Sequence, residues 1–84
     1  MNRQIRILHL EDNPQDAELI RSSLLEAGYD CLVTRVQTAE DFSRNLKGFP
    51  YDLILSDHTL PGYDGLSALE TARKQAPDVP FVFV

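Results

Sequence analysis

Three acidic residues follow two apolar runs of the sequence and are its clearest candidates for chemistry. Glu11 and Asp12 come directly after the run Ile5–Leu10, and Asp57 follows the run Leu53–Ser56. Carboxylates that lie close together repel one another, which raises their pKa values or recruits a cation. Mg²⁺ prefers oxygen ligands and binds a few carboxylates, waters and a phosphate oxygen. A carboxylate beside such an ion can accept a phosphoryl group as a nucleophile. The residue types therefore predict a Mg²⁺-assisted phosphoryl site with Asp57 as the nucleophile.

An isolated Asp at the end of an apolar run has a simpler explanation. It is commonly a turn residue, because its side chain hydrogen-bonds to the neighbouring backbone. Asp57 also precedes a loop that contains Pro and Gly, which fits this structural role. The choice between the two interpretations depends on whether the fold brings Asp57 close to Glu11 and Asp12.

The pattern of apolar residues predicts strands that alternate with helices. Short apolar runs predict four strands, at residues 5–10, 31–36, 52–56 and 79–84. Apolar residues at three- and four-residue spacing predict three helices between these strands. The first helix begins at Asn13-Pro14 and is closed by Gly28, the second follows Thr38 and ends at Gly48, and the third runs from residue 66 to 76.

Alternating strands and helices imply a parallel sheet with right-handed crossovers. In such a sheet the carboxyl ends of all strands meet at one edge, and ligands bind there at the point where the strand order reverses. With the order 2-1-3-4, the reversal lies between the first and third strands. Adjacent strands are about 4.8 Å apart, so Glu11, Asp12 and Asp57 are expected to meet in one pocket.

Composition and charge exclude several classes of protein. The formal net charge of −5 argues against binding to nucleic acid or to a membrane surface, which both need a basic footprint. Cys31 is the single cysteine, so it is expected to be a small core residue of a strand. No segment approaches the roughly 20 apolar residues of a membrane helix. We therefore expect a soluble cytoplasmic domain.

Two segments carry a resemblance to a known family. ILHLEDNPQDAELI and DLILSDHTLPGYDGL together resemble the receiver domain of two-component response regulators, and the match covers essentially the whole chain. The resemblance implies a flavodoxin-like, doubly wound α/β fold. It also implies that Asp57 accepts a phosphoryl group from a histidine kinase or phosphotransfer protein. Mg²⁺ is then held by Glu11, Asp12 and Asp57 and by the backbone carbonyl of Thr59.

The chain also departs from the family pattern. Leu60 and Tyr63 stand in the loop where Met is common, and His58 occupies a position that influences access to the phosphoryl group. Receiver domains also have a Ser or Thr after the fourth strand and a Lys after the fifth. Lys47 and Lys74, the only lysines, fall on predicted helices and cannot replace that Lys.

The predicted elements are fewer than those of a receiver domain. Residues 1–84 are expected to be its N-terminal portion, of order βαβαβαβ, without the fifth strand and the last two helices. The uncovered sheet edge would then favour dimerisation or association, and phosphotransfer would be impaired.

Two other functions fit these residues less well. A pseudo-receiver that acts only as a protein interaction module would not need three adjacent carboxylates. A phosphatase with an Asp nucleophile usually has a second acid two residues later, where this chain has Thr59. His9 lies inside the first strand and is expected to be a packed, hydrogen-bonded core residue instead of a catalyst.

Overall fold

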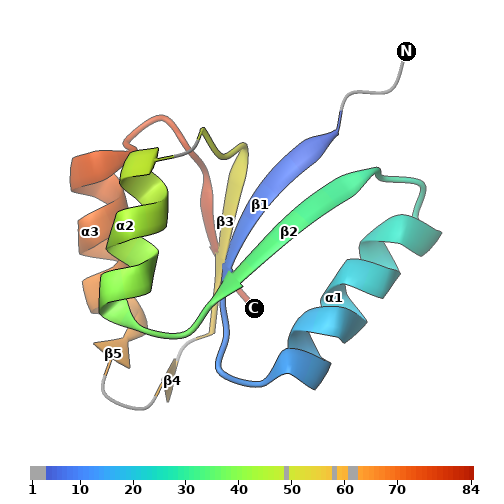
Figure 1. Cartoon of the computed structure of the whole chain (residues 1–84), viewed down its shortest axis with the longest axis horizontal. Helices are drawn as coiled ribbons and strands as arrows, with labels where there is room; N and C mark the ends of the chain where they lie inside the picture. The colour runs from blue at the N-terminus through green and yellow to red at the C-terminus, as the bar shows by residue number, and fades with distance from the viewer. Residues whose placement is uncertain (1–3, 49, 58, 61–62) are drawn as a thin grey trace.

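The computed structural model describes residues 4–48, 50–57, 59–60 and 63–84. Four parallel strands form one sheet in the order β2-β1-β3-β6, which confirms the predicted order 2-1-3-4 (Figure 1). These strands are β1 (Ile5–Leu10), β2 (Cys31–Val36), β3 (Leu53–Ser56) and β6 (Phe81–Phe83). The helices are α1 (Pro14–Glu26), α2 (Ala39–Gly48) and α3 (Gly65–Gln75). Helix α1 covers one face of the sheet, and α2 and α3 cover the other (Figure 1).

The sheet has a larger and a smaller hydrophobic core on its two faces. Alternate residues of a strand point to opposite faces, so β1 contributes Leu8 and Leu10 to one core and Ile7 to the other. The larger core joins the sheet to α2 and α3 and contains Phe42, which has no exposed surface. The smaller core lies under α1 and includes Cys31, whose thiol pKa is raised by burial and by the charge of Asp30. Cys31 is thus a core residue, as predicted.

Both ends of α1 follow from local sequence. Asn13 is the N-cap, and its side-chain oxygen accepts a hydrogen bond from the backbone N–H of Gln15 at 2.8 Å. Pro14 follows at the first helical position, where its missing N–H costs nothing. Gly28 has a φ of +96°, a conformation that glycine adopts without steric cost. The chain therefore turns sharply into β2 at the predicted residue.

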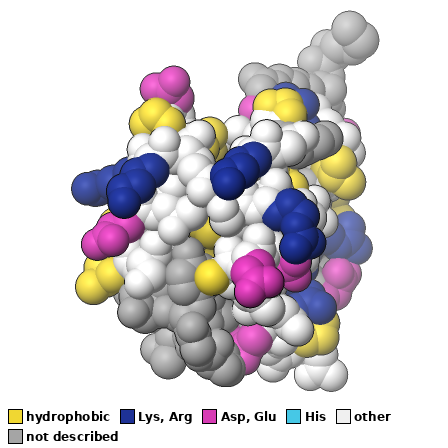
Figure 2. Space-filling model, turned by 60° about the vertical axis from the view of Figure 1, so that its left-hand side comes forward, with side chains coloured by type: hydrophobic (Ala, Val, Ile, Leu, Met, Phe, Trp, Pro, Cys, Tyr) yellow, Lys and Arg dark blue, Asp and Glu magenta, His cyan; other side chains and the backbone are white. Residues whose placement is uncertain are grey.

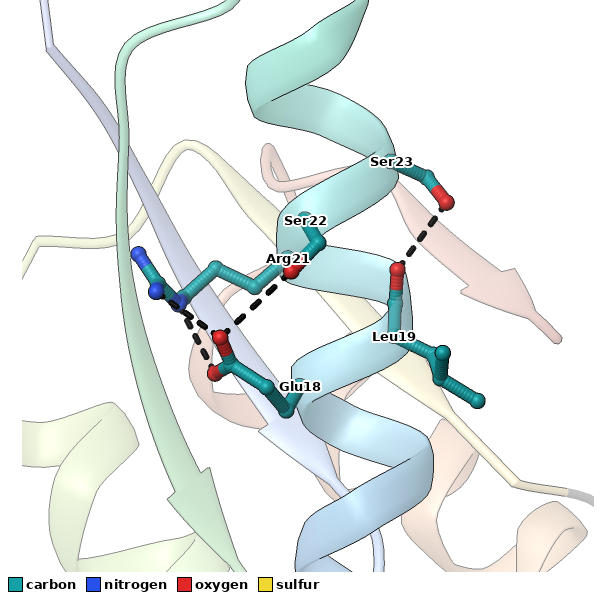
Figure 3. A network of polar contacts seen from close by, with 5 residues as sticks. All are labelled: Glu18, Leu19, Arg21, Ser22 and Ser23. Carbon is teal, nitrogen blue, oxygen red and sulfur yellow. Dashed lines mark hydrogen bonds and ion pairs between the residues drawn. The ribbon is translucent and has the colours of Figure 1, made fainter.

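The exposed side of α1 carries a local polar network (Figure 3). Arg21 donates two hydrogen bonds to the carboxylate of Glu18, at 3.0 and 2.9 Å, and Ser22 donates a third at 3.4 Å. Ser23 bonds instead to the backbone carbonyl of Leu19 at 2.9 Å. Exposed ion pairs of this kind contribute little stability, and the side chain of Leu19 remains 67% exposed.

The start of α2 and its packing on α3 are also visible in the hydrogen bonds. The hydroxyl of Thr38 accepts a hydrogen bond from the backbone N–H of Asp41 at 3.1 Å, as a helix cap does. Farther along, the side-chain amide of Gln75 in α3 donates to the hydroxyl of Ser43 in α2 at 2.8 Å. The two helices therefore lie side by side over one face of the sheet (Figure 1).

Helix α3 lies one residue earlier than predicted, and the structure differs from the predicted elements in three further places. Strand β3 begins at Leu53, one residue later than predicted. Asp52 still contacts β1, because its backbone N–H donates to the carbonyl of Arg6 at 2.7 Å and its side chain accepts from the N–H of Arg6 at 2.9 Å. Strand β6 is shorter than predicted, although the carbonyl of Pro80 and the N–H of Val84 still bond to β3.

The third difference lies in the predicted loop after β3. It contains a two-stranded antiparallel hairpin of β4 (Thr59–Leu60) and β5 (Tyr63–Asp64). Strands this short carry no periodic signal that sequence analysis can detect. In the part of the chain that is described, no helix is both long and apolar enough to cross a membrane.

Candidate functional site

The three predicted carboxylates meet at the carboxyl edge of the sheet. One carboxylate oxygen from each of Glu11, Asp12 and Asp57 lies within 4.8 Å of the other two. Glu11 is buried, Asp57 is half-buried and Asp12 is exposed. They lie where β1 and β3 end side by side, which is the point at which the strand order reverses. A turn role alone does not explain why all three carboxylates converge here.

Backbone pairing at the strand ends sets this arrangement. The N–H of Asp57 donates to the carbonyl of Leu10 at 3.1 Å, and the N–H of Glu11 donates to the carbonyl of Val36 at 2.9 Å. Both bonds extend the parallel ladders by one residue beyond the strands. Glu11 and Asp57 are therefore held by the sheet itself and not by a free loop.

Glu11 has the most perturbed environment of the cluster. Its side chain is 5% exposed, and burial is the largest cause that raises its pKa. A side-chain hydrogen bond with Asp12 and the negative charges of Asp57 and Asp12 raise this pKa further. The backbone N–H of Asn13 donates to Glu11 Oε2 at 3.2 Å and acts in the opposite direction. Together these causes disfavour the ionised form of Glu11. A cation bound beside Glu11 would therefore stabilise its negative charge.

The donor set fits a hard divalent cation. All three side chains offer carboxylate oxygens, and the described part of the site presents no sulfur or imidazole ligand. Mg²⁺ is commonly bound by one or two carboxylates together with waters and phosphate oxygens. Glu11, Asp12 and Asp57 are the residues that would hold it, and the ion would supply positive charge next to a transferring phosphoryl group.

A small cleft opens beside the carboxylates, between α1 and the ends of the strands. Its volume is about 300 Å³. The residues that line it come from the acidic cluster, from α1 and from the end of the chain: Glu11, Asp16, Leu19, Ile20, Asp57 and Val84. Sequence analysis missed Asp16, although its position four residues after Asp12 at the start of a helix is a signal that could have found it.

Arg35 is a second residue that sequence analysis missed. Its guanidinium Nη1 donates to the backbone carbonyl of Glu11 and to the side-chain oxygen of Gln37, both at 3.1 Å. It therefore anchors the backbone at the point where β1 ends. No sequence motif marks this contact, because it depends on the pairing of β1 with β2.

The structure bears only in part on the predictions for Thr59 and His58 in the loop after β3. Thr59 is the first residue of β4, and its backbone pairs with Asp64 in β5. Its role as a carbonyl ligand stays a prediction. His58 lies outside the described residues.

His9 is buried as predicted, but the prediction that it is hydrogen-bonded is wrong. Its side chain has no exposed surface, and neither ring nitrogen has a hydrogen-bond partner within the described structure. It points to the same face as Ile7, under α1, and it pairs in register with Arg35 of β2. Burial lowers the pKa of His9, and the charge of Arg35 adds to this, while the charge of Asp57 opposes it. Burial of the ring thus favours the neutral imidazole over the charged one.

Three comparisons bear on the identity of the chain. Residues 7–84 match the family model described as "Response regulator receiver domain". The transcriptional activator protein IrlR of Burkholderia pseudomallei is 35% identical over 80 residues, which cover 95% of this chain and 34% of IrlR. The chain thus spans about a third of the length of this curated relative.

The chain is also similar to solved structures of receiver domains and response regulators. The receiver domain of the sensor histidine kinase PA1611 from Pseudomonas aeruginosa, solved with a magnesium ion coordinated in its active-site cleft, has a TM-score of 0.80 and 34% identity. The match covers 96% of this chain and 66% of that one. A complex of histidine kinase ThkA with the response regulator TrrA matches with a TM-score of 0.76 and 29% identity, over 94% of this chain and 66% of the matched one.

The family match spans nearly the whole chain, and it agrees with the strand order and with the convergence of Glu11, Asp12 and Asp57. The chain belongs to the response regulator receiver domain family, whose members are signalling modules of two-component systems and not classical enzymes.

Proposed function

We propose that this chain is a phosphoacceptor module in which Asp57 receives a phosphoryl group from a histidine kinase or phosphotransfer protein. The observation that carries the proposal is the convergence of three carboxylates within 4.8 Å at the carboxyl edge of a parallel sheet. An arrangement of like charges is costly unless a cation or a chemical role compensates for it. Glu11 and Asp12 then serve as Mg²⁺ ligands and Asp57 as both ligand and nucleophile.

The transfer itself is a substitution at phosphorus. One carboxylate oxygen of Asp57 forms a bond to the phosphorus of the donor phosphohistidine, the P–N bond breaks, and the imidazole nitrogen keeps its electron pair. The product on this chain is an acyl phosphate. Bound Mg²⁺ would neutralise charge on the transferring oxygens. The bond from the N–H of Asp57 to the carbonyl of Leu10 holds the nucleophile at the mouth of the cleft.

The surface beside the cleft supports a protein as the donor. Leu19 lines the cleft together with Asp57, yet its side chain is 67% exposed. Single exposed apolar side chains are common on protein surfaces, so the contact of the kinase with Leu19 is part of the proposal and needs its own test. The relative TrrA was solved in complex with a histidine kinase. A kinase that contacts Leu19 would bring its phosphohistidine to the cleft.

Phosphorylation by acetyl phosphate tests the phosphoacceptor role without a kinase. Residues 1–84, and a version extended through the fifth strand of a receiver domain, are incubated with acetyl phosphate and MgCl₂ and analysed by intact mass, each beside an Asp57→Asn control. We expect a phosphate-sized mass gain that requires Asp57 and is larger in the extended version. No gain in either protein would favour the pseudo-receiver, an interaction module that is not phosphorylated.

Kinase-dependent phosphorylation tests the contact at Leu19. Leu19→Glu is expected to slow transfer from the cognate kinase by tenfold or more, on the order of 1.4 kcal/mol, and to leave labelling by acetyl phosphate unchanged. Leu25→Glu is the matched control, because Leu25 is also exposed on α1 but lies outside the cleft. Equal slowing by both substitutions would contradict a contact specific to Leu19.

Three further expectations accompany this proposal and stay predictions. They are the cytoplasmic location, the role of residues 1–84 as the N-terminal portion of a longer receiver domain, and association through the sheet edge. Sedimentation at several protein concentrations checks the last of these, and a single monomeric species would contradict it.

A further inference from the structure

Arg35 makes a different kind of contact from Arg21 and Arg44 on the helices. Lys and Arg side chains are interspersed with Asp and Glu on the side of the molecule that bears α2 and α3 (Figure 2). Arg21 pairs with Glu18, three positions away on α1. Arg44 pairs in the same way with Asp41 on α2. Arg35 forms no ion pair in the described part of the chain, and it donates to a backbone carbonyl that lies 24 positions away in the sequence. Its guanidinium therefore joins two segments that are distant along the chain.

The backbone of Glu11 is held by β2 through both of its polar groups. Its N–H donates to the carbonyl of Val36 at 2.9 Å, and its carbonyl accepts from Arg35 Nη1 at 3.1 Å. The first bond continues the ladder between β1 and β2. In a longer parallel ladder, a backbone N–H of the neighbouring strand would bond to the carbonyl as well. Strand β2 ends at Val36, however, and the chain enters α2 at Ala39. The side chain of Arg35 supplies the donor at this carbonyl.

This carbonyl belongs to the peptide group that joins Glu11 to Asp12. Both residues contribute carboxylates to the cluster, in which the ligand oxygens lie within 4.8 Å of one another. The peptide group is planar, so a rotation of its plane would move both side chains together. Repulsion among the three carboxylates favours such a movement. The bond from Arg35 opposes it.

Arg35 is itself held in place by a second bond. Its Nη1 also donates to the side-chain oxygen of Gln37 at 3.1 Å. The guanidinium is planar and its N–H groups point in fixed directions, so bonds to two acceptors define its position closely. Both acceptors are neutral oxygens. Arg35 therefore holds the backbone of the site and leaves the carboxylates of Glu11 and Asp12 available to a cation.

We propose that Arg35 is a positioning residue of the site, which holds the Glu11–Asp12 peptide so that both carboxylates can bind one Mg²⁺ ion. This inference rests on the proposed function, in which Glu11 and Asp12 are Mg²⁺ ligands. A bond that only joined β1 to β2 would change the free energy of unfolding but not the affinity of the folded protein for Mg²⁺. The Mg²⁺ affinity therefore separates the positioning role from a purely structural one.

Mg²⁺ titration of Arg35→Met tests the proposal. Loss of a positive charge near a cation site would by itself tighten Mg²⁺ binding, because the two cations repel. Loss of the anchor would weaken binding, so the sign of the change separates the charge of Arg35 from its contact. We expect Arg35→Met to raise the Kd for Mg²⁺ by about fivefold, as the loss of one hydrogen bond would. Isothermal titration calorimetry with MgCl₂ as the only ligand measures this Kd.

Two further variants control for charge and for the loss of any strand arginine. Arg35→Lys keeps the charge and a donor, so it should raise the Kd less than Arg35→Met does. Arg6→Met is the matched control, because Arg6 pairs with Asp52 at 3.5 Å but lies at the opposite end of β1. It should change the Kd by less than about twofold. Urea unfolding without Mg²⁺ confirms that each variant is folded under the conditions of the titration.

The backbone amide of Asp12 gives a readout that needs no metal. Its nitrogen belongs to the same peptide group as the carbonyl of Glu11, so its chemical shift responds to a hydrogen bond at that carbonyl. We expect Arg35→Met to move the Asp12 amide resonance of the metal-free chain more than Arg6→Met does. An unchanged resonance in Arg35→Met would show that Arg35 does not hold this peptide and would overturn the proposal.

The positioning role and the phosphoacceptor role can fail separately. If acetyl phosphate labels Asp57 and Arg35→Met binds Mg²⁺ as tightly as the unmodified chain or more tightly, only the positioning role is wrong. Equal weakening by Arg6→Met would contradict the positioning role as well. If Mg²⁺ binding depends on Arg35 but Asp57 is not labelled, only the phosphoacceptor role is wrong. An unmodified chain that binds no Mg²⁺ would overturn the positioning role together with the Mg²⁺ site.

Discussion

The backbone N–H of Asp57 lies 3.1 Å from the carbonyl oxygen of Leu10, to which it donates a hydrogen bond. This bond continues the pairing of β1 with β3 by one residue beyond Ser56. It therefore fixes Asp57 level with Glu11, the residue that follows Leu10. The carboxylate cluster is a product of strand register, and a change of register by one residue would turn these side chains to the other face.

Removal of the charge at Glu11 is expected to stabilise the chain in the absence of divalent cations. Burial and neighbouring carboxylates raise the pKa of Glu11 in the folded state above 4.5. The stability linked to this group is therefore fully present below pH 4.5 and is lost as the pH rises through the folded pKa. Glu11→Gln should raise the free energy of unfolding at pH 7 by roughly 1 kcal/mol, the scale of one close like-charge repulsion in water.

Urea unfolding at pH 7 and pH 4 checks this prediction. The difference between Glu11→Gln and the unmodified chain should shrink at pH 4, where Glu11 is protonated in the folded state. A variant that is less stable than the unmodified chain at pH 7 would contradict the assigned repulsion.

Mg²⁺ is expected to raise the Tm through the same cluster. A ligand at about ten times its Kd stabilises a folded protein by about 1.4 kcal/mol. Asp12→Asn should remove most of this gain, because the exposed Asp12 is one of three carboxylates within 4.8 Å. Glu26→Gln, at the far end of α1, is the matched control. Thermal unfolding with MgCl₂, against NaCl at equal ionic strength, measures the effect, and an equal gain in Asp12→Asn would argue against this site.

His9→Leu is expected to stabilise the fold. Both imidazole nitrogens are buried without a hydrogen-bond partner in the described structure. Each orphaned polar group costs about 1–3 kcal/mol, and Leu fills a similar volume without that cost. Chemical denaturation at pH 7 should show a gain of about 1 kcal/mol or more. A loss of more than this amount would indicate that the imidazole is bonded through a buried water.

The same substitution should change how stability depends on pH. Burial lowers the pKa of His9 in the folded state below 6.5, so the unfolded chain takes up a proton first as the pH falls. The stability linked to His9 is therefore present above pH 6.5 and is lost as the pH falls below it. The unmodified chain should lose more stability than His9→Leu between pH 7 and pH 5.5, and parallel profiles would contradict the assignment.

Asn13→Ala is expected to destabilise the chain by about 1 kcal/mol, the usual cost of losing a helix N-cap. The side chain of Asn13 accepts from the N–H of Gln15 at 2.8 Å, and the loss of this bond leaves a helix donor without its partner. Asn13→Ser keeps a side-chain acceptor without adding a charge beside Asp12, and it should be nearly neutral. Urea unfolding of the two variants measures the difference, and equal stabilities would show that solvent replaces the cap.

Most of the fold could be predicted from local patterns. Apolar runs and helix caps such as Asn13 and Thr38 gave the order of elements, and that order restricts the topology to a parallel sheet. The convergence of Glu11, Asp12 and Asp57 followed from the rule that parallel strands end at one edge. The hairpin of β4 and β5 could not be predicted, because strands of two residues have no period.

The sequence alone thus determined which carboxylates meet, since their positions at strand ends depend only on element order and direction. The tertiary structure alone decided which polar side chains are buried and which contacts they make. The burial of Glu11, the unpartnered nitrogens of His9 and the contact between Ser43 and Gln75 all depend on which distant segments pack together. Desolvation and hydrogen bonding act between neighbours in space, and 32 positions of sequence separate the last pair.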